Sequence, residues 1–178
     1  PEPVMPCTEG NRTNMTGIDG ERLAKAVMVA AFGCFGLIVM FNNITDYDSN
    51  YQFVRHVLSM DTTFPHNRLM WRAMTTPFIW QAGYDIIIAC EGTTGLLFIL
   101  AALSMLRNLN GNPADFRHAT RLVPWGTMMG FLVWFFGFTV VGGEWFAMWQ
   151  SHSWNGQQPA FQFISMMMLM CLYVRTKE

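Results

Sequence analysis

The fold is decided by the stretch IWQAGYDIIIACEGTTGLLFILAALSML, which spans residues 79–106. Asp85 and Glu91 are its only charged side chains, and its apolar and polar residues do not alternate as they would in a strand. A helix needs about 20 mainly apolar residues to cross a hydrocarbon core about 30 Å thick. The stretch therefore predicts a membrane-spanning helix that carries two acids.

Three further stretches of the chain have the same character. One precedes the deciding stretch, at residues 23–44, and two follow it, at residues 123–148 and 157–174. The composition agrees with a membrane protein, because 52% of the residues are hydrophobic and only 13% are charged, against roughly 25% charged in a typical soluble domain. A net charge of −1 provides no basic surface for nucleic acid. The sequence predicts an all-α fold, an integral membrane four-helix bundle.

The longest connection lies between the first two predicted helices, at residues 45–78. A connection of this length usually has structure or function of its own. Its apolar residues recur at roughly helical spacing, which predicts a short amphipathic helix along the membrane surface and hence a partly helical outer loop. Residues 1–21 are interpreted as an N-terminal extension, and residues 22–178 as the transmembrane domain. The loop residues that set the helical pattern are Tyr51, Phe53, Val54, Val57, Leu58 and Met60.

Basic residues predict the orientation, since cytoplasmic segments of membrane proteins are enriched in lysine and arginine. The outer loop holds only three of the eleven basic residues, Arg55, Arg68 and Arg72, and we expect these to pair with acids or phospholipid headgroups. The others lie in the two tails and in the connection between the second and third helices. Both termini are therefore expected on the cytoplasmic side or, in a mitochondrion, on the matrix side. The basic residues of that side are Arg12, Arg22, Lys25, Arg107, Arg117, Arg121, Arg175 and Lys177.

Three acids lie within the predicted spans: Asp85, Glu91 and Glu144. A charge near the bilayer centre costs about 2.5–3.5 kcal/mol on insertion scales, so such residues usually face the bundle interior and have partners. At about 1.5 Å per residue, Asp85 and Glu144 are expected at a similar depth in the outer half of the bilayer. With polar residues at the end of the first span, they predict an intramembrane polar cluster under the outer loop. It comprises Asn42, Asn43, Asp46, Asp85, Glu91 and Glu144.

Two interpretations of this polar cluster are open. In the first, it is structural, and ion pairs and hydrogen bonds fasten the outer loop to the bundle. In the second, it forms a proton or ion path, or a polar substrate pocket. The first is favoured because a path would need acids at several depths, and the inner half of the spans has none.

Glycines mark the positions where helices are expected to approach closely, because small residues let helix backbones come together in lipid. Gly33 and Gly36 lie in the first predicted span, and Gly126 and Gly130 lie in the third.

No metal, haem or catalytic nucleophile is expected. The histidines lie outside the inner parts of the spans, whereas a bis-histidine haem needs facing histidines within the bundle. The chain has no G-x-S-x-G, no H-E-x-x-H and no phosphate-binding glycine loop. We therefore expect no enzymatic activity and no cofactor, structural phospholipids apart. A weaker alternative is a quinone-binding anchor that uses Trp80 and Tyr84 near His66.

Two long runs carry a resemblance to a known family. They are NNITDYDSNYQFVRHVLSMDTTFPHNRLMWRAM in the outer loop and FGFTVVGGEWFAMWQSHSWNGQQPAF near the third helix. Both are similar to the DUF2165 family of predicted small integral membrane proteins of bacteria. The resemblance extends from about Leu23 to Tyr173. It implies four helices in a membrane and no settled activity.

The leading functional hypothesis is a non-catalytic accessory subunit of a larger energy-transducing membrane complex, such as a respiratory or other electron-transfer assembly. The chain contains more phenylalanine, methionine and tryptophan than contact with lipid alone requires. Such residues are enriched at interfaces between proteins. The expected partners are other membrane-protein subunits and phospholipids, in a bacterial-type or mitochondrial inner membrane. The alternative is a small transporter or ion- or proton-conducting protein that uses the intramembrane acids.

Overall fold

The computed structural model describes residues 19–176, and this part of the chain contains helices and no strand. Residues 1–18 of the predicted N-terminal extension, with Arg12, and Lys177 lie outside the described residues. The helices are α1 Gly20–Thr45, α2 Tyr47–Ser59, η1 Met70–Arg72, α3 Pro77–Arg107, α4 Pro113–Ala119, η2 Thr120–Leu122, α5 Val123–Gly130, η3 Phe131–Trp145, η4 Met148–Gln150 and α6 Gln157–Arg175.

The ends of the long helices follow from local sequence signals. The Asp19 side chain accepts hydrogen bonds from the backbone N–H groups of Glu21 and Arg22, and thereby caps the first turn of α1. Pro77 and Pro113 stand at the starts of α3 and α4, where a missing N–H does no harm. The observed helix ends lie within three residues of the ends of the predicted stretches. This holds for α1, α3, α5 with η3, and α6.

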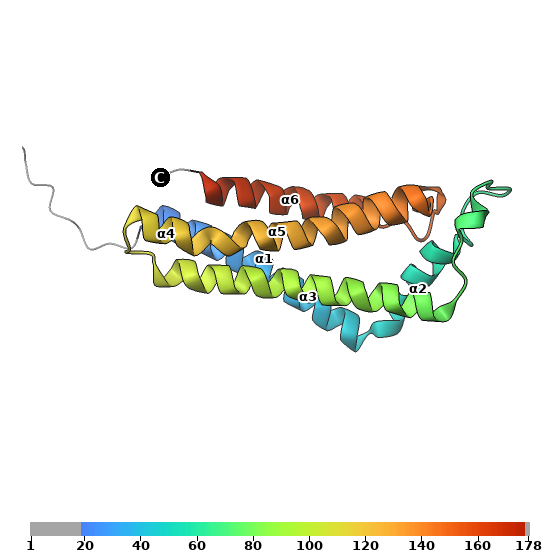
Figure 1. Cartoon of the computed structure of the whole chain (residues 1–178), viewed down its shortest axis with the longest axis horizontal. Helices are drawn as coiled ribbons and strands as arrows, with labels where there is room; N and C mark the ends of the chain where they lie inside the picture. Colours follow the sequence, from blue (N-terminus) through green and yellow to red (C-terminus); the bar gives the residue numbers. More distant parts are fainter. Residues whose placement is uncertain (1–18, 177–178) are drawn as a thin grey trace, which may run out of the picture.

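The long helices run lengthwise in an elongated bundle (Figure 1). The start of α1, α4 and the end of α6 lie at one end of the bundle, and α2 and the connection from α2 to α3 lie at the other. We call these the inner end and the outer end. The apolar core runs between α1, α3, α5 and α6, and its fully buried members include Val29, Phe98, Met105 and Met167.

The closest contact in the bundle joins α1 to α3. A Cβ atom added at Gly36 would lie 2.8 Å from the Gly95 Cα atom, and one added at Gly95 would lie 2.6 Å from the Leu37 backbone nitrogen. No side chain fits between these backbones. The expectation that Gly33 and Gly36 allow close approach is confirmed, and Gly95 is the partner that the sequence pattern did not indicate.

The third long helix changes character halfway along. From Phe131 to Trp145 it is a π-helix, whereas the sequence predicted an α-helix throughout. The Phe146 N–H donates to the Val141 carbonyl five residues earlier, as this wider winding requires. Such segments are rare and frequently lie at functional sites.

Three helical stretches of the described residues are long and apolar enough to cross a membrane: Gly20–Thr45, Pro77–Arg107 and Pro113–Trp145. The last stretch joins α4, η2, α5 and η3. The helix α6 is not among them, since its 19 residues include three glutamines and a serine.

The outer loop is attached to the bundle by two patches of apolar contact. The helix α2 buries Val54 beside Tyr84 and Ile88 of α3. Val57 and Met60 pack against the residues that follow η3, Phe146 and Met148 among them. The second patch continues through a left-handed residue, Ala147, with φ 52°.

Candidate functional site

A carboxyl group lies inside the bundle, near the middle of α3. The Glu91 side chain is 3% exposed, and its Oε2 atom accepts a hydrogen bond of 2.7 Å from Asn43 Nδ2 in the last turn of α1. Asn43 is itself only 6% exposed. A buried polar group is costly unless it is hydrogen-bonded, and here each member of the pair satisfies the other.

Two further side chains complete a hydrogen-bonded group around Asn43. Asn50 Nδ2, on α2, donates to Asn43 Oδ1 over 2.7 Å, and the Tyr84 hydroxyl donates to the Asn43 backbone oxygen over 3.2 Å. Tyr84 and Glu91 are seven residues apart, which is about two helical turns, so both lie on the face of α3 toward Asn43. We call Asn43, Asn50, Tyr84 and Glu91 the polar group.

The polar group forms one wall of a cavity of about 300 Å³ that is partly open to the outside. Ligand sites in proteins begin at about this volume. The opposite walls come from α2, η3 and the start of α6, and no lysine, arginine or histidine is among the lining residues. The acid and the amide oxygens therefore favour an occupant that donates hydrogen bonds or carries a positive charge. The other walls are formed mainly by Phe53, Trp134, Phe138, Asn155, Gly156, Pro159 and Phe163.

The predicted six-residue cluster does not form one unit in the structure. Asn43 and Glu91 meet inside the bundle, but Asp85 is exposed and accepts from the Tyr47 hydroxyl at 2.7 Å. Asp46 accepts from the Ser49 hydroxyl at the turn between α1 and α2. Asn42 is exposed, and its backbone oxygen accepts from the Asp46 N–H and the Thr45 hydroxyl.

Glu144 was expected at a similar depth to Asp85, as a member of the same polar cluster. The Glu144 side chain is exposed, and no hydrogen bond or ion pair within residues 19–176 joins it to Asp85 or to the polar group. It lies in the π-helical segment.

The outer-loop arginines contact aromatic rings rather than acids. The Arg72 guanidinium lies 4.5 Å and 5.2 Å from the ring centres of Trp145 and Trp71, and its Nη1 donates to the Trp145 carbonyl. Arg55 lies over the Trp80 ring and donates to Gln52, and Arg68 is exposed. Within residues 19–176 none of the three forms an ion pair, and their pairing with acids or phospholipid headgroups stays a prediction.

Tyr47 fastens α2 to α3 beside the polar group. Its ring meets the Tyr84 ring edge-on at 4.7 Å, and its hydroxyl donates to Asp85. Burial, with the hydrogen bond and charge of Asp85, raises the pKa of Tyr47 to about 12. The phenol therefore stays a hydrogen-bond donor over the whole physiological pH range.

The geometry of the described residues supports neither a metal site nor the quinone site considered above. Among the described residues no three histidine, cysteine or acidic side chains are grouped as metal ligands would be. An apolar groove of about 410 Å³ does lie between α2, α3 and η3, but Trp80, Tyr84 and His66 do not line it. Tyr84 instead points its hydroxyl at Asn43.

Sequence reasoning missed three members of the cavity wall. Asn50 and Asn155 lie outside the predicted spans, and Trp134 is one aromatic residue in a long aromatic run. One feature of the sequence could have indicated a polar site. Tyr84 and Glu91 are spaced so that a hydroxyl and a carboxyl lie on one helix face.

Comparison with known proteins identifies the family. A family model described as a predicted small integral membrane protein, DUF2165, matches residues 21–177. No curated protein and no solved structure matches the chain. The family match covers nearly the whole chain, and three of its helical stretches have the length and apolar character of membrane spans. The chain is therefore an integral membrane protein and belongs to the DUF2165 family.

Proposed function

We propose that the protein is a non-catalytic membrane protein that binds a small solute with a cationic or hydrogen-bond-donating head in the cavity at Glu91. The observation that supports this proposal is the position of Glu91, a buried acid in the wall of a partly open cavity that no basic residue lines. A cation in the cavity next to Glu91 and Asn43 would contact a carboxylate oxygen and an amide oxygen. The aromatic walls would contact its apolar part and, if it is a quaternary ammonium, attract its charge.

The proposal includes a topology of four spans with α6 as the fourth. The 19 residues of α6 extend over about 28 Å at 1.5 Å per residue, close to the thickness of a hydrocarbon core. Its inner end carries Arg175, at the same end of the bundle as Arg22 and Arg107. This agrees with both termini on the cytoplasmic or matrix side of an inner membrane.

Binding is favoured over conduction by the packing on the inner side of Glu91. Between Glu91 and the inner end, the interior is filled by fully buried apolar residues such as Val29, Phe98, Ala101 and Met105. A transporter would have to open this core during each cycle. Transport therefore remains the alternative to a static binding role, and it predicts a second conformation.

A titration of purified protein tests the proposal. In detergent, we expect methylammonium, ethanolamine or choline to quench tryptophan fluorescence, since Trp134 lines the cavity. Glu91→Gln should weaken the affinity at least tenfold, because it removes the charge and keeps the shape. Asp85→Asn is the matched control, an exposed acid on the same helix, and should bind as wild type. Equal affinities of wild type and Glu91→Gln for every amine would refute the site. Flux of the bound amine into proteoliposomes would identify a transporter.

A second candidate function, an accessory subunit of an energy-transducing complex, is favoured by the aromatic surface at the outer end. Trp71 pairs with Trp145, and Phe64 pairs with Trp149, each edge-on. All four side chains are at least 46% exposed. Aromatic residues and arginine are enriched at the centres of protein interfaces.

Co-purification tests the second candidate. We expect the native protein, extracted in a mild detergent, to migrate in stoichiometric amounts with a larger complex. Trp71→Ala combined with Trp145→Ala should release it, whereas Phe161→Ala, an exposed residue of α6, should not. Migration of the wild type as a free chain or a homo-oligomer would contradict an accessory role.

A further inference from the structure

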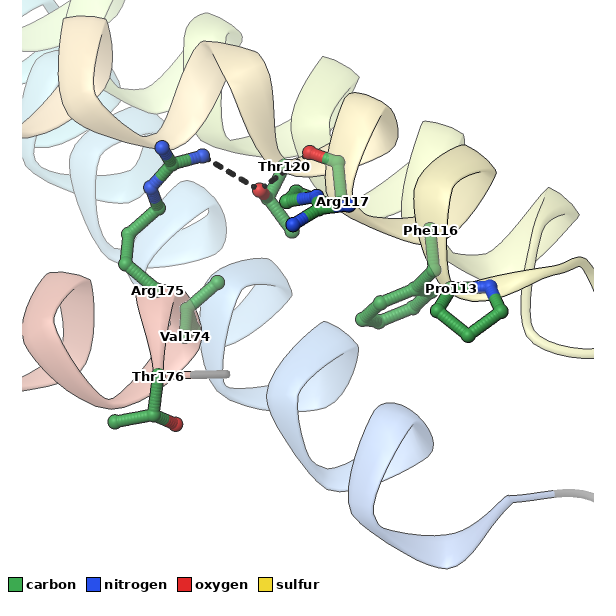
Figure 2. A pocket seen from close by; sticks show the side chains of 7 residues that line it. All are labelled: Pro113, Phe116, Arg117, Thr120, Val174, Arg175 and Thr176. Atoms are coloured by element: carbon green, nitrogen blue, oxygen red, sulfur yellow. Dashed lines mark hydrogen bonds between the residues drawn. The ribbon is translucent and has the colours of Figure 1, made fainter. Parts of the chain in front are cut away.

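Another pocket opens at the inner end of the bundle, and it shares no lining residue with the Glu91 cavity. It lies between α4 with η2 on one side and the end of α6 on the other, and its volume is about 410 Å³. Figure 2 shows the open space between these two walls, with the ribbon of α1 behind it. It is lined by Pro113, Phe116, Arg117, Thr120, Val174, Arg175 and Thr176.

The upper part of this inner pocket is cationic. Arg117 comes from α4 and Arg175 from α6, and no acid is among the lining residues. Neither arginine forms an ion pair with a carboxylate inside the described range. The nearby carboxylate of Asp115 is engaged by the Asn112 side chain at 2.6 Å. Two arginines therefore line one pocket, and no carboxylate is among the other lining residues.

A hydroxyl group holds the two walls of the pocket together. Arg175 Nη1 donates to Thr120 Oγ1 over 3.2 Å, and Thr120 Oγ1 donates to the Arg117 carbonyl over 2.9 Å (Figure 2). Thr120 is 2% exposed. The Arg175 side chain is thus directed toward Thr120 and fastened to it.

Apart from the arginines and two threonines, the lining side chains are apolar. Phe116 and Val174 are 2% and 3% exposed, and Pro113 lies beside Phe116. The pocket therefore combines two basic residues with apolar side chains. One of its walls is the start of Pro113–Trp145, a stretch that is long and apolar enough to span the membrane, and the end of such a stretch is expected at the level of the phospholipid headgroups.

We infer that the inner pocket binds the phosphate group of an anionic phospholipid. Guanidinium groups match phosphate oxygens in geometry and charge, and basic pockets between helices on the cytoplasmic side attract anionic headgroups. The phosphate lies between Arg117 and Arg175, and the glycerol and the first acyl carbons lie against Phe116 and Val174. This site is separate from the proposed solute site, and neither proposal depends on the other.

Native mass spectrometry of the full, delipidated chain tests the inference. With short-chain phosphatidylglycerol added at a fixed ratio, we expect a bound lipid that phosphatidylcholine does not replace at the same concentration. Arg117→Gln combined with Arg175→Gln should reduce this occupancy at least tenfold. Arg107→Gln combined with Arg121→Gln is the charge-matched control at the same end, since neither residue lines the pocket, and it should keep the lipid.

Three outcomes would overturn the inference. Equal occupancy by phosphatidylcholine would remove the need for an anionic headgroup, and this comparison uses only the wild-type chain. Equal loss in the control pair would show a general effect of charge. Displacement of the lipid by millimolar inorganic phosphate, with retention of that phosphate, would assign the pocket to a soluble anion. Replacement of both arginines by lysine, which keeps the charge, should restore most of the occupancy and exclude misfolding as the cause of the loss.

Discussion

Replacing Gly95 with leucine is expected to prevent α1 from packing on α3 and to eliminate folded protein. A side chain at Gly95 meets the Leu37 backbone nitrogen at 2.6 Å and the Gly33 carbonyl oxygen at 2.9 Å. Both are backbone atoms and cannot rotate away, so the two helices must separate. The smaller change Gly95→Ala should destabilise by about 1–3 kcal/mol, the usual cost of overpacking, and should thus outweigh the gain of about 1 kcal/mol in helix propensity.

Gly83→Ala is the matched control for this prediction. It is the same substitution in the same helix, but its new Cβ would meet only side-chain methyl groups of Leu58 and Val54, at 3.6 Å and 3.9 Å. Helix propensity alone then acts, and the variant should be unchanged or more stable by up to about 1 kcal/mol. Thermal unfolding in detergent, followed by tryptophan fluorescence, measures both. If Gly95→Ala is as stable as Gly83→Ala, the close α1–α3 contact is wrong.

The helices were predictable from the sequence because their signals are local. Long apolar runs give the position of α1, α3 and α6, and Asp19 and Pro77 supply the signals for the first turns. The contacts between helices depend on distant partners. The pairing of Asn43 with Glu91 requires the rotation of α1 on α3, which is set by the contact of Gly36 with Gly95.

The position of Glu144 illustrates the limit of a depth estimate. The rise per residue places Glu144 along the third span but does not tell which way its side chain points. In the structure Glu144 lies in the π-helical segment, and its side chain is exposed. The same segment contributes Trp134 and Phe138 to the cavity. The cavity therefore could not be predicted from the sequence either.

Asn43→Leu is expected to destabilise the protein more than any single change at Glu91. Asn43 donates to Glu91 and accepts from Asn50, so its loss leaves the buried Glu91 carboxyl without its partner. An unsatisfied buried polar group costs about 1–3 kcal/mol, and more when it is charged. Asn50 contributes less to the loss, because its side chain is exposed and can turn outward.

The variants of Glu91 decide whether the pair acts through its hydrogen bond or through its charge. Glu91→Gln keeps an oxygen that accepts from Asn43, and we expect its unfolding midpoint and expression to match wild type. Asn43→Leu combined with Glu91→Leu should recover most of the stability lost in Asn43→Leu, because replacing both partners with apolar groups is nearly neutral. Strictly additive effects, or a collapse in the expression of Glu91→Gln, would contradict the hydrogen-bonded pair. A stable Glu91→Gln that no longer binds amines would separate the two roles: the hydrogen bond maintains the bundle, and the charge is available for a ligand.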